Sequence, residues 1–383
     1  MIVKFLFSSP KGDLPLDPDI GATPFKITPD KSHPFLTLND YFEAMKAFVL
    51  KDDGKPLTTS LRKHLSEDLS FKQIRRLLIR SEKHGALYHV ASVDIIGPAK
   101  RSKLSVSTAV SERGKCWLNR EYDILKELGE THDLSYLPKV YFKGDMDRRV
   151  GKNRITLSMF LGEWFEDYHE WHLSIHPQKR EQRICMWDLK KGHRFASRSE
   201  TYEIYEQAAK ILTLYYDTRN FRQIYPWHHA AGDFVVRTSK GGVEVKLATA
   251  REYKPFMTFL KEEQANPLVA IVYFLFNMTL KTRLDKLDGV GDTAWAGGLS
   301  VEATVKGFFE ALRIMEKKGG YSLGKVEDLR SLLTSFSQDE IWRLFQSLLV
   351  LYREEDPGDL LVIEKNLESH VEKLYQVMQR FHV

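Results

Sequence analysis

The sequence contains little cysteine and no long uninterrupted apolar segment. It has two cysteines, Cys116 and Cys185, among 383 residues. This excludes a disulfide-stabilised scaffold and favours a reducing compartment. The longest apolar run, residues 268–280, is interrupted by Asn277 and is shorter than the roughly 20 residues of a membrane-spanning helix. The apolar start, residues 1–7, lacks the long core and cleavage site of a signal peptide. We therefore expect a cytoplasmic protein with no membrane partner.

Several signatures of nucleotide-binding and hydrolytic enzymes are missing as well. The chain has no Walker loop, no Gly-x-Ser-x-Gly elbow and no dinucleotide fingerprint. It also has no long block of Lys and Arg, and its 57 basic and 52 acidic residues give a net charge of +5. This mild excess tolerates an anionic ligand, but nucleic acid is not expected as a partner.

The composition is that of a globular protein. Hydrophobic residues make up 43% of the chain and aromatic residues 12%, which predicts well-filled cores. The length suits two or three substructures. We expect an α+β fold in three regions: an N-terminal extension over residues 1–84, a small β-rich lobe over 85–162, and a large helical lobe over 163–383 with a β-hairpin near 234–247.

The N-terminal region changes character along its length. Six of the fourteen prolines fall between Pro10 and Pro34, which predicts extended chain there. A helix is expected over residues 38–50, with Thr37 or Asn39 as its cap. The apolar spacing over residues 71–78 predicts a second helix.

The middle of the chain alternates between strand and helix patterns. Residues 86–162 predict strand, strand, helix, strand, strand, with connections too short for parallel crossovers, so the sheet should be mostly antiparallel. Beyond residue 163 the pattern is mainly helical. The elements expected are strands at 86–96, 104–110, 139–142 and 155–160, helices at 118–128, 202–216, 268–280 and 367–381, and a hairpin at 234–237 and 243–247.

This order of elements, together with three short segments, resembles the protein kinase-like fold of the aminoglycoside phosphotransferase and choline kinase type. Residues 117–128, WLNREYDILKEL, resemble the small-lobe helix of those families, whose Glu pairs with a strand Lys that holds the nucleotide phosphates. Glu121 matches that Glu. Residues 137–141, LPKVY, resemble the following strand, and residues 159–164, MFLGEW, the adenine-binding hinge. The resemblance implies two lobes, a small antiparallel sheet lobe and a mainly helical lobe.

The strongest local resemblance is residues 226–236, PWHHAAGDFVV. The family pattern there is His-Gly-Asp, four residues, Asn and three apolar residues. Asp233 takes the place of the metal-binding Asn and remains a competent ligand for a hard cation. His228 takes the place of the catalytic Asp. A histidine can act as a base, but a neutral imidazole brings no negative charge to orient a hydroxyl.

Other positions depart further from the family pattern. Ala248, two residues after Lys246, stands where the family has its second metal-binding Asp. Ser107 stands where the strand Lys is expected, while Lys103 comes too early and Lys115 too late. The first hairpin carries a single glycine, so no glycine-rich phosphate loop is evident.

These departures lead to two hypotheses. The leading one is a degenerate kinase-like protein, a pseudokinase, that binds a small molecule or a protein in the cleft between its lobes without efficient phosphoryl transfer. The alternative is a divergent phosphotransferase that uses ATP and Mg²⁺ and acts on a small-molecule or protein hydroxyl. Asp233 would then hold the metal and His228 would act as base. The nucleotide side of that site would comprise Glu121, Ser107 and a lysine from among Lys103, Lys115 and Lys246.

A third hypothesis rests on a group of histidines. His169, His172 and His176 are spaced by three and four residues, so on a helix they would share one face and could bind zinc. The neighbouring tryptophans favour a different interpretation, a wet helix surface or a partner-facing patch.

Overall fold

The computed structural model describes two compact units of an α+β fold. They comprise Met1–Glu166 and Asp167–Val383. The residues described are 1–9, 12–28, 31–65, 70–85, 87–98, 100–188, 191–228, 232–239, 241–255 and 266–381.

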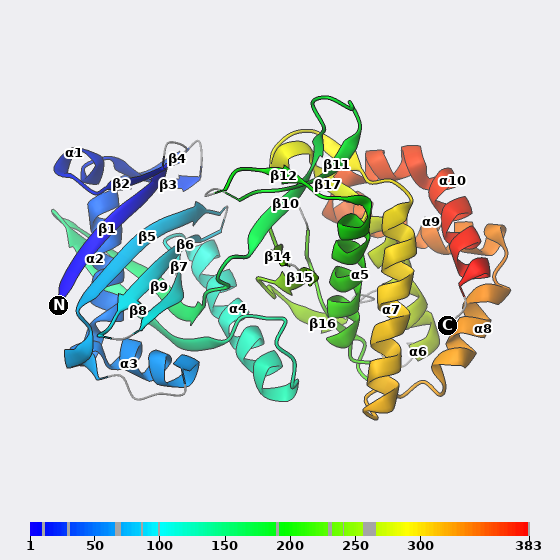
Figure 1. The fold of residues 1–383 in the computed structure, drawn as a ribbon, viewed down its shortest axis with the longest axis horizontal. Coiled ribbons are helices and arrows are strands. Elements are labelled where there is room, and N and C mark those ends of the chain that lie inside the picture. Colours follow the sequence, from blue (N-terminus) through cyan, green and yellow to red (C-terminus); the bar gives the residue numbers. More distant parts are fainter. Residues whose placement is uncertain are drawn as a thin grey trace. The chain divides into compact units, whose positions relative to one another are not determined.

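The first unit is built on strands with a few helices (Figure 1). Its strands are β1 (Ile2–Ser9), β2 (Gly12–Pro15), β3 (Pro24–Thr28), β4 (Lys31–Thr37), β5 (Arg76–His84), β6 (His89–Ile96), β7 (Arg101–Ala109), β8 (Val140–Val150) and β9 (Asn153–Glu163). Its helices are α1 (Pro18–Gly21), α2 (Leu38–Val49), α3 (Lys51–Leu65) and α4 (Glu112–Thr131), with a short 3₁₀ turn at Phe71–Gln73.

A seven-stranded sheet organises this unit. Its strand order is β2-β1-β5-β6-β7-β9-β8. Every neighbouring pair is antiparallel except β1 and β5, which run parallel. The predicted sequence of two strands, a helix and two strands is confirmed as β6, β7, α4, β8 and β9, and so is the mostly antiparallel sheet.

The two faces of this sheet differ in chemistry. Directly paired residues of neighbouring strands share a face, so Ala91 and Val106 lie on one face and Val90 and Ser107 on the other. The first face is apolar and forms one core with residues of α2 and α3. The second packs against α4 through a smaller cluster around Leu118. Polar strand side chains therefore concentrate on the face that carries α4.

The structure corrects part of the N-terminal prediction. The prediction of a helix over 71–78 is wrong, because the chain makes a 3₁₀ turn at Phe71–Gln73 and then enters β5. Leu77 and Ile79 are both fully buried while Leu78 is only partly buried. This period of two is that of a strand. The helix expected over 38–50 is confirmed as α2, which Thr37 caps by accepting from the backbone N–H of Asp40.

The expected extension over residues 1–84 has no boundary of its own in the structure. Strands β1, β2 and β5 belong to the same sheet as β6–β9. Along the chain, the first unit ends at Glu166 and the second begins at Asp167, four residues after the expected start of the large lobe. The parallel pairing of β1 with β5 joins segments about 70 residues apart. No local sequence pattern predicts this pairing.

The second unit is mainly helical. Its helices are α5 (Arg198–Leu214), α6 (Pro267–Lys281), α7 (Leu299–Lys317), α8 (Val326–Ser335), α9 (Gln338–Glu355) and α10 (Pro357–Arg380). Its strands are β10 (His169–Ile175), β11 (Gln182–Met186), β12 (Arg194–Phe195), β13 (Arg222–Ile224), β14 (Phe234–Ser239), β15 (Gly242–Leu247), β16 (Tyr253–Pro255), β17 (Leu284–Lys286) and β18 (Thr293–Trp295), with a 3₁₀ turn at Leu287–Gly289.

Helix α6 is the buried helix expected from the apolar run 268–280. Asn266 caps it, and every residue from Ala270 to Lys281 is buried. Among the described residues, none of the helices is both long and apolar enough to cross a membrane.

Helix α5 carries the predicted hairpin of β14 and β15. The strands form a sheet in the order β12-β11-β10-β14-β15, so β15 is an edge strand. From α5, the Gln207 amide donates to the Val243 carbonyl (2.6 Å) and accepts from the Val245 N–H (3.1 Å). The Glu203 carboxylate accepts from the Val243 N–H (3.1 Å). On its other side, α5 packs against α7 at Gly307, where an added Cβ would lie 2.0 Å from the Glu206 carbonyl oxygen.

A row of polar side chains crosses the apolar face of the first unit's sheet. His84, His89 and Thr108 are direct cross-strand neighbours on β5, β6 and β7. The His84 and His89 rings lie 4.5 Å apart, and the Tyr41 ring lies 6.1 Å from His89. Burial, with a smaller effect of His84, lowers the pKa of His89 to about 3. His89 is therefore neutral in the folded protein at physiological pH.

This neutral histidine predicts acid sensitivity. Because its pKa is lower in the folded than in the unfolded protein, the stability it contributes is present above pH 6.5 and is lost as the pH falls toward 3. Between pH 7 and pH 5 the free energy of unfolding should decrease by about 2 kcal/mol from this group. The profile of His89→Leu, measured by urea denaturation, should be flatter by that amount. Equal pH dependence of the free energy of unfolding in the two proteins would contradict a neutral, buried His89. At pH 8 the two free energies should differ only by the effect of the substitution on packing.

Candidate functional site

The segment with the strongest family resemblance lies between β13 and β14 in the second unit. Its residues 229–231 fall outside the described part of the chain. Trp227 is buried and packs edge-on against Phe234, with ring centroids 5.7 Å apart. This contact anchors the segment to the start of the hairpin and fixes the backbone on which His228 and Asp233 lie.

Asp233 is held in a bidentate ion pair. Arg251 donates from Nη1 to Oδ2 (2.7 Å) and from Nη2 to Oδ1 (2.6 Å) of the Asp233 carboxylate. The backbone N–H of His228 donates to Oδ2 as well (2.8 Å). The Asp233 side chain is 1% exposed. A metal ion at this carboxylate would have to compete with a guanidinium in the geometry that Arg and carboxylate groups favour most.

His228 is paired with an acid from the far end of the chain. Its Nε2 lies 3.4 Å from Oδ2 of Asp359, in the first turn of α10. Burial alone would raise the pKa of Asp359, but the adjacent His228, together with the charges of Lys281 and Lys286, lowers it below its usual value. A carboxylate behind an imidazole orients the ring, as in general-base dyads.

The end of the hairpin brings no second acid. Lys246 is half-buried on β15, opposite Val235. The backbone N–H of Ala248 donates to the Asp233 carbonyl (2.7 Å). The backbone therefore places residue 248 beside Asp233, and the side chain of Ala248 is a methyl group.

In the first unit, the expected nucleotide-side acid has a hydroxyl partner. Glu121 lies on the buried side of α4 with 3% of its surface exposed. The Tyr88 hydroxyl donates a hydrogen bond to its carboxylate. In active kinases, the acid of the small-lobe helix pairs with a strand lysine.

The lysines named from the sequence have partners elsewhere in the first unit. Lys103 Nζ lies 3.4 Å from the Glu82 carboxylate and 4.1 Å from the centroid of the Trp164 ring. Lys115 pairs with Glu112 at 2.6 Å. Ser107 is buried on β7. The structure thus brings His228 and Asp233 together, and it ties Lys103 and Lys115 to acids other than Glu121.

The three histidines of the zinc hypothesis do not share a helix face. His169 and His172 lie on β10, where an odd separation puts them on opposite faces, and His176 follows the strand. His172 lies between Asp285 (3.5 Å) and Glu170 (3.7 Å), and despite burial these two acids raise its pKa to about 9. The described residues contain no group of three or more His, Cys, Asp and Glu that could hold a metal ion.

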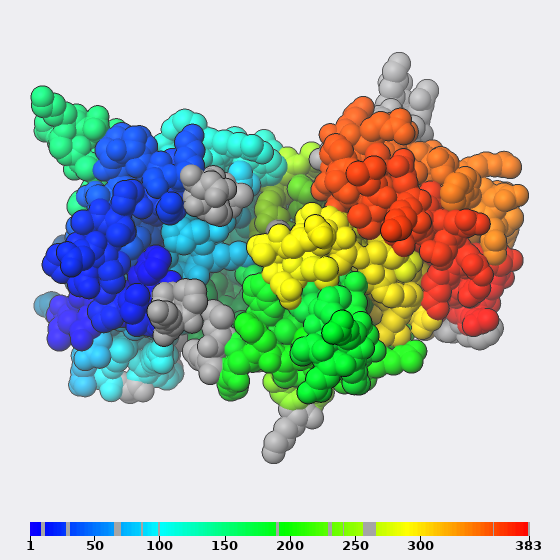
Figure 2. All heavy atoms as spheres, turned by 90° about the horizontal axis from the view of Figure 1, so that it is seen from above, coloured from blue at the N-terminus to red at the C-terminus, as the bar shows by residue number. Residues whose placement is uncertain are grey.

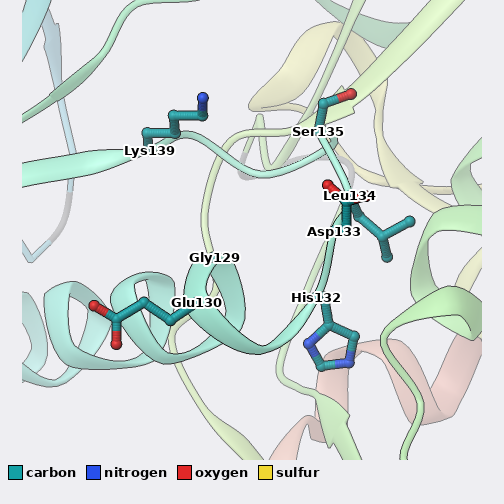
Figure 3. A pocket seen from close by; sticks show the side chains of 7 residues that line it. All are labelled: Gly129, Glu130, His132, Asp133, Leu134, Ser135 and Lys139. Carbon is teal, nitrogen blue, oxygen red and sulfur yellow. The ribbon is translucent and has the colours of Figure 1, made fainter. Parts of the chain in front are cut away.

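A shallow hollow of about 460 Å³ lies in the first unit where α4 ends. Figure 3 shows its lining, which comes from the end of α4 and the loop into β8. None of the candidate site residues named above lines it. The lining residues are Gly129, Glu130, His132, Asp133, Leu134, Ser135 and Lys139.

Three residues of the candidate site were not predicted from the sequence. Tyr88, Arg251 and Asp359 supply the partners of Glu121, Asp233 and His228. Arg251 had a weak signal, because it is a basic residue four positions after the end of the hairpin that follows the acid. Asp359 is 131 positions after His228, so no spacing could have connected them.

The ion pair predicts a large stability effect. Arg251→Met leaves Asp233 buried without its guanidinium, so the free energy of unfolding should fall by about 3–5 kcal/mol. Arg237→Met, at an exposed pair with Glu244 (2.6 Å), should cost less than about 1 kcal/mol. Urea denaturation measures both. A loss at Arg251→Met no larger than the control, or no recovery on adding Asp233→Asn, would contradict the role of the pair.

Comparison with protein-family models and with curated proteins does not place this chain in a family. No protein-family model matches the sequence, and no curated protein matches it at a significant level. The function is therefore argued from the geometry of the site and from the resemblance in element order.

Proposed function

We propose that this chain is a kinase-like protein with degenerate catalytic motifs, a pseudokinase, that binds a small molecule or a protein partner without efficient phosphoryl transfer. The single observation that carries the proposal is the Asp233 carboxylate, which is the expected metal ligand and is bonded at both oxygens to Arg251. Under this proposal, a positive side chain balances the charge of the carboxylate that a metal would otherwise balance.

The architecture of each unit supports the kinase-like part of the proposal. In the first unit, α4 follows β7, precedes β8 and packs on the sheet with Glu121 on its buried side. In the second, the long helix α5 precedes the 226–233 segment and its hairpin, and further helices follow. This order of elements supports the resemblance, although strands β10, β11 and β12 stand between the first unit and α5.

The charges support the degenerate part. Phosphoryl transfer relies on cations that hold the phosphates and on acids that hold Mg²⁺ and orient the nucleophile. Ser107, His228 and Ala248 stand at three positions where the family has charged side chains. Glu121 accepts a hydrogen bond from the neutral Tyr88 hydroxyl. Loss of several such charges at once removes most of the transition-state stabilisation.

A divergent phosphotransferase is the second candidate, and the His228–Asp359 pair favours it. The acid at 3.4 Å would hold the imidazole in orientation for taking a proton from a hydroxyl. Mg²⁺ would then have to displace Arg251 from Asp233. His228→Gln and Asp359→Asn should both abolish turnover under this hypothesis and change nothing catalytic under the first.

The match between Ser107 and the phosphate-holding lysine of the family can be tested by substitution. If Ser107 replaces the phosphate-holding lysine, a lysine introduced there can reach the Glu121 carboxylate. Ser107→Lys should then be at least as stable as Ser107→Met, a matched side chain without the charge. If Glu121 is out of reach, the buried ammonium group should make the lysine variant about 3–5 kcal/mol less stable than the methionine variant. Urea denaturation distinguishes the two results.

Nucleotide binding and turnover test the proposed function directly. Thermal unfolding should be measured with and without ATP, in Mg²⁺, in Mn²⁺ and in EDTA, because a ligand of the folded state raises the midpoint by mass action. We expect no metal-dependent rise with ATP. Phosphate release and transfer should be at least about 1000-fold below the 1–100 s⁻¹ typical of kinases.

The opposite outcome is equally definite. A metal-dependent rise that disappears in Asp233→Ala, together with turnover at an ordinary enzymatic rate, would overturn the pseudokinase proposal and establish the phosphotransferase. The Asp233→Ala variant needs a folding control, because it leaves the Arg251 guanidinium without its acid. Circular dichroism of both proteins supplies it.

A further inference from the structure

A buried arginine far along the chain from the candidate site has no acid beside it. Arg283 lies between α6 and β17 and is 7% exposed. Its Nε donates to the Ala296 carbonyl (2.8 Å), and its Nη1 lies 3.3 Å from Nδ1 of His370. Both partners are neutral groups, and among the described residues no carboxylate forms an ion pair with it.

The charge on Arg283 persists despite burial. Burial lowers the pKa of its guanidinium to about 10, so the group remains protonated at neutral pH. The nearest acid along the chain is Asp285, which accepts hydrogen bonds from the backbone N–H of Leu173 (2.7 Å) and Lys286 (2.7 Å) and pairs with His172. A buried cation without a counter-charge is costly.

A second donor beside Arg283 is unsatisfied. The guanidinium lies over the Trp295 ring, 4.5 Å from its centroid. The Trp295 Nε1–H is buried and has no hydrogen-bond partner. A buried N–H donor in a folded protein normally has a hydrogen-bond acceptor. Because a cation lies next to this donor, an anionic acceptor would satisfy both groups.

The remaining wall of this place is apolar or neutral. His370 is fully buried in α10, its pKa is lowered by burial and by Arg283, and its Nε2 lies 3.2 Å from the Thr279 hydroxyl. Helix α10 packs against β18, and Figure 2 shows the yellow segment that contains β18 beside the red C-terminal helix.

We propose that Arg283 and Trp295 form a buried binding site for a small monovalent anion of the halide class. One positive charge matches one negative charge. A guanidinium and one indole N–H give enough donors for chloride or bromide, whereas a phosphate dianion would leave oxygens unsatisfied and one charge unbalanced. The site is independent of the proposed pseudokinase function, because it shares no residue with the 226–251 segment.

Anion-dependent stability tests the site. The thermal midpoint of the full chain should be measured in sodium chloride, sodium bromide and sodium gluconate at equal ionic strength. Gluconate is too large and too strongly hydrated to enter a buried two-donor site. We expect a midpoint higher by on the order of a few degrees in chloride and bromide than in gluconate. Equal midpoints in the three salts would overturn the proposal.

Variants locate the effect. Arg283→Met should remove the difference between halide and gluconate. Trp295→Phe keeps the aromatic face and removes only the N–H donor, so it should weaken the difference even if the arginine variant fails to fold. The matched control is Arg330→Met on α8, where Glu327 and the Phe381 carbonyl are the partners. It should keep the full difference. An unchanged difference in Trp295→Phe would count against the site.

A crystal grown in sodium bromide gives a structural readout. Anomalous scattering should place a bromide ion within hydrogen-bonding distance of the Arg283 guanidinium and of Trp295 Nε1. An ordered water without anomalous signal at that position would overturn the proposal. Because neither experiment uses nucleotide, their failure leaves the pseudokinase proposal unaffected, and its failure leaves the anion site unaffected.

Discussion

The bidentate pair of Asp233 and Arg251 is the interaction on which the candidate site depends. It joins the residue that opens the hairpin to a residue beyond its end, so the two strands and the 226–233 segment share one fixed point. Because the carboxylate is buried, the guanidinium stabilises the fold whether or not a ligand is bound. The same contact commits both oxygens of the Asp233 carboxylate to a guanidinium within the protein.

The sheet of the first unit distributes its chemistry by face. Its apolar face forms the main core with α2 and α3, while its other face carries α4 with the serines and charged residues of β6 and β7. Lys103, Glu82 and Ser92 form one such polar group, in which the Ser92 hydroxyl donates to Glu82 (2.6 Å). This group is largely buried, so its charges and hydroxyl satisfy one another within the first unit.

Local periodicity predicted most helices and strands, since it depends on burial of one face. It failed at residues 71–78, where Leu77, Leu78 and Ile79 fit both periods and the pairing of β5 with β1 and β6 decides between them. It failed again at His169 and His172, whose spacing is helical although the segment is a strand. The partners Arg251, Asp359 and Tyr88 depend on tertiary contacts between distant segments, so a single sequence could not supply them.

The helix α5 has a consequence for how this protein behaves at high concentration. Strand β15 ends its sheet, and an open strand edge can recruit the same strand of another copy. Glu203 and Gln207 occupy the backbone N–H and carbonyl groups of Val243 and the N–H of Val245. Two side chains of one helix therefore make the backbone hydrogen bonds that a further strand would make. These bonds protect the β15 edge from pairing with another copy, although the sheet has no additional strand there.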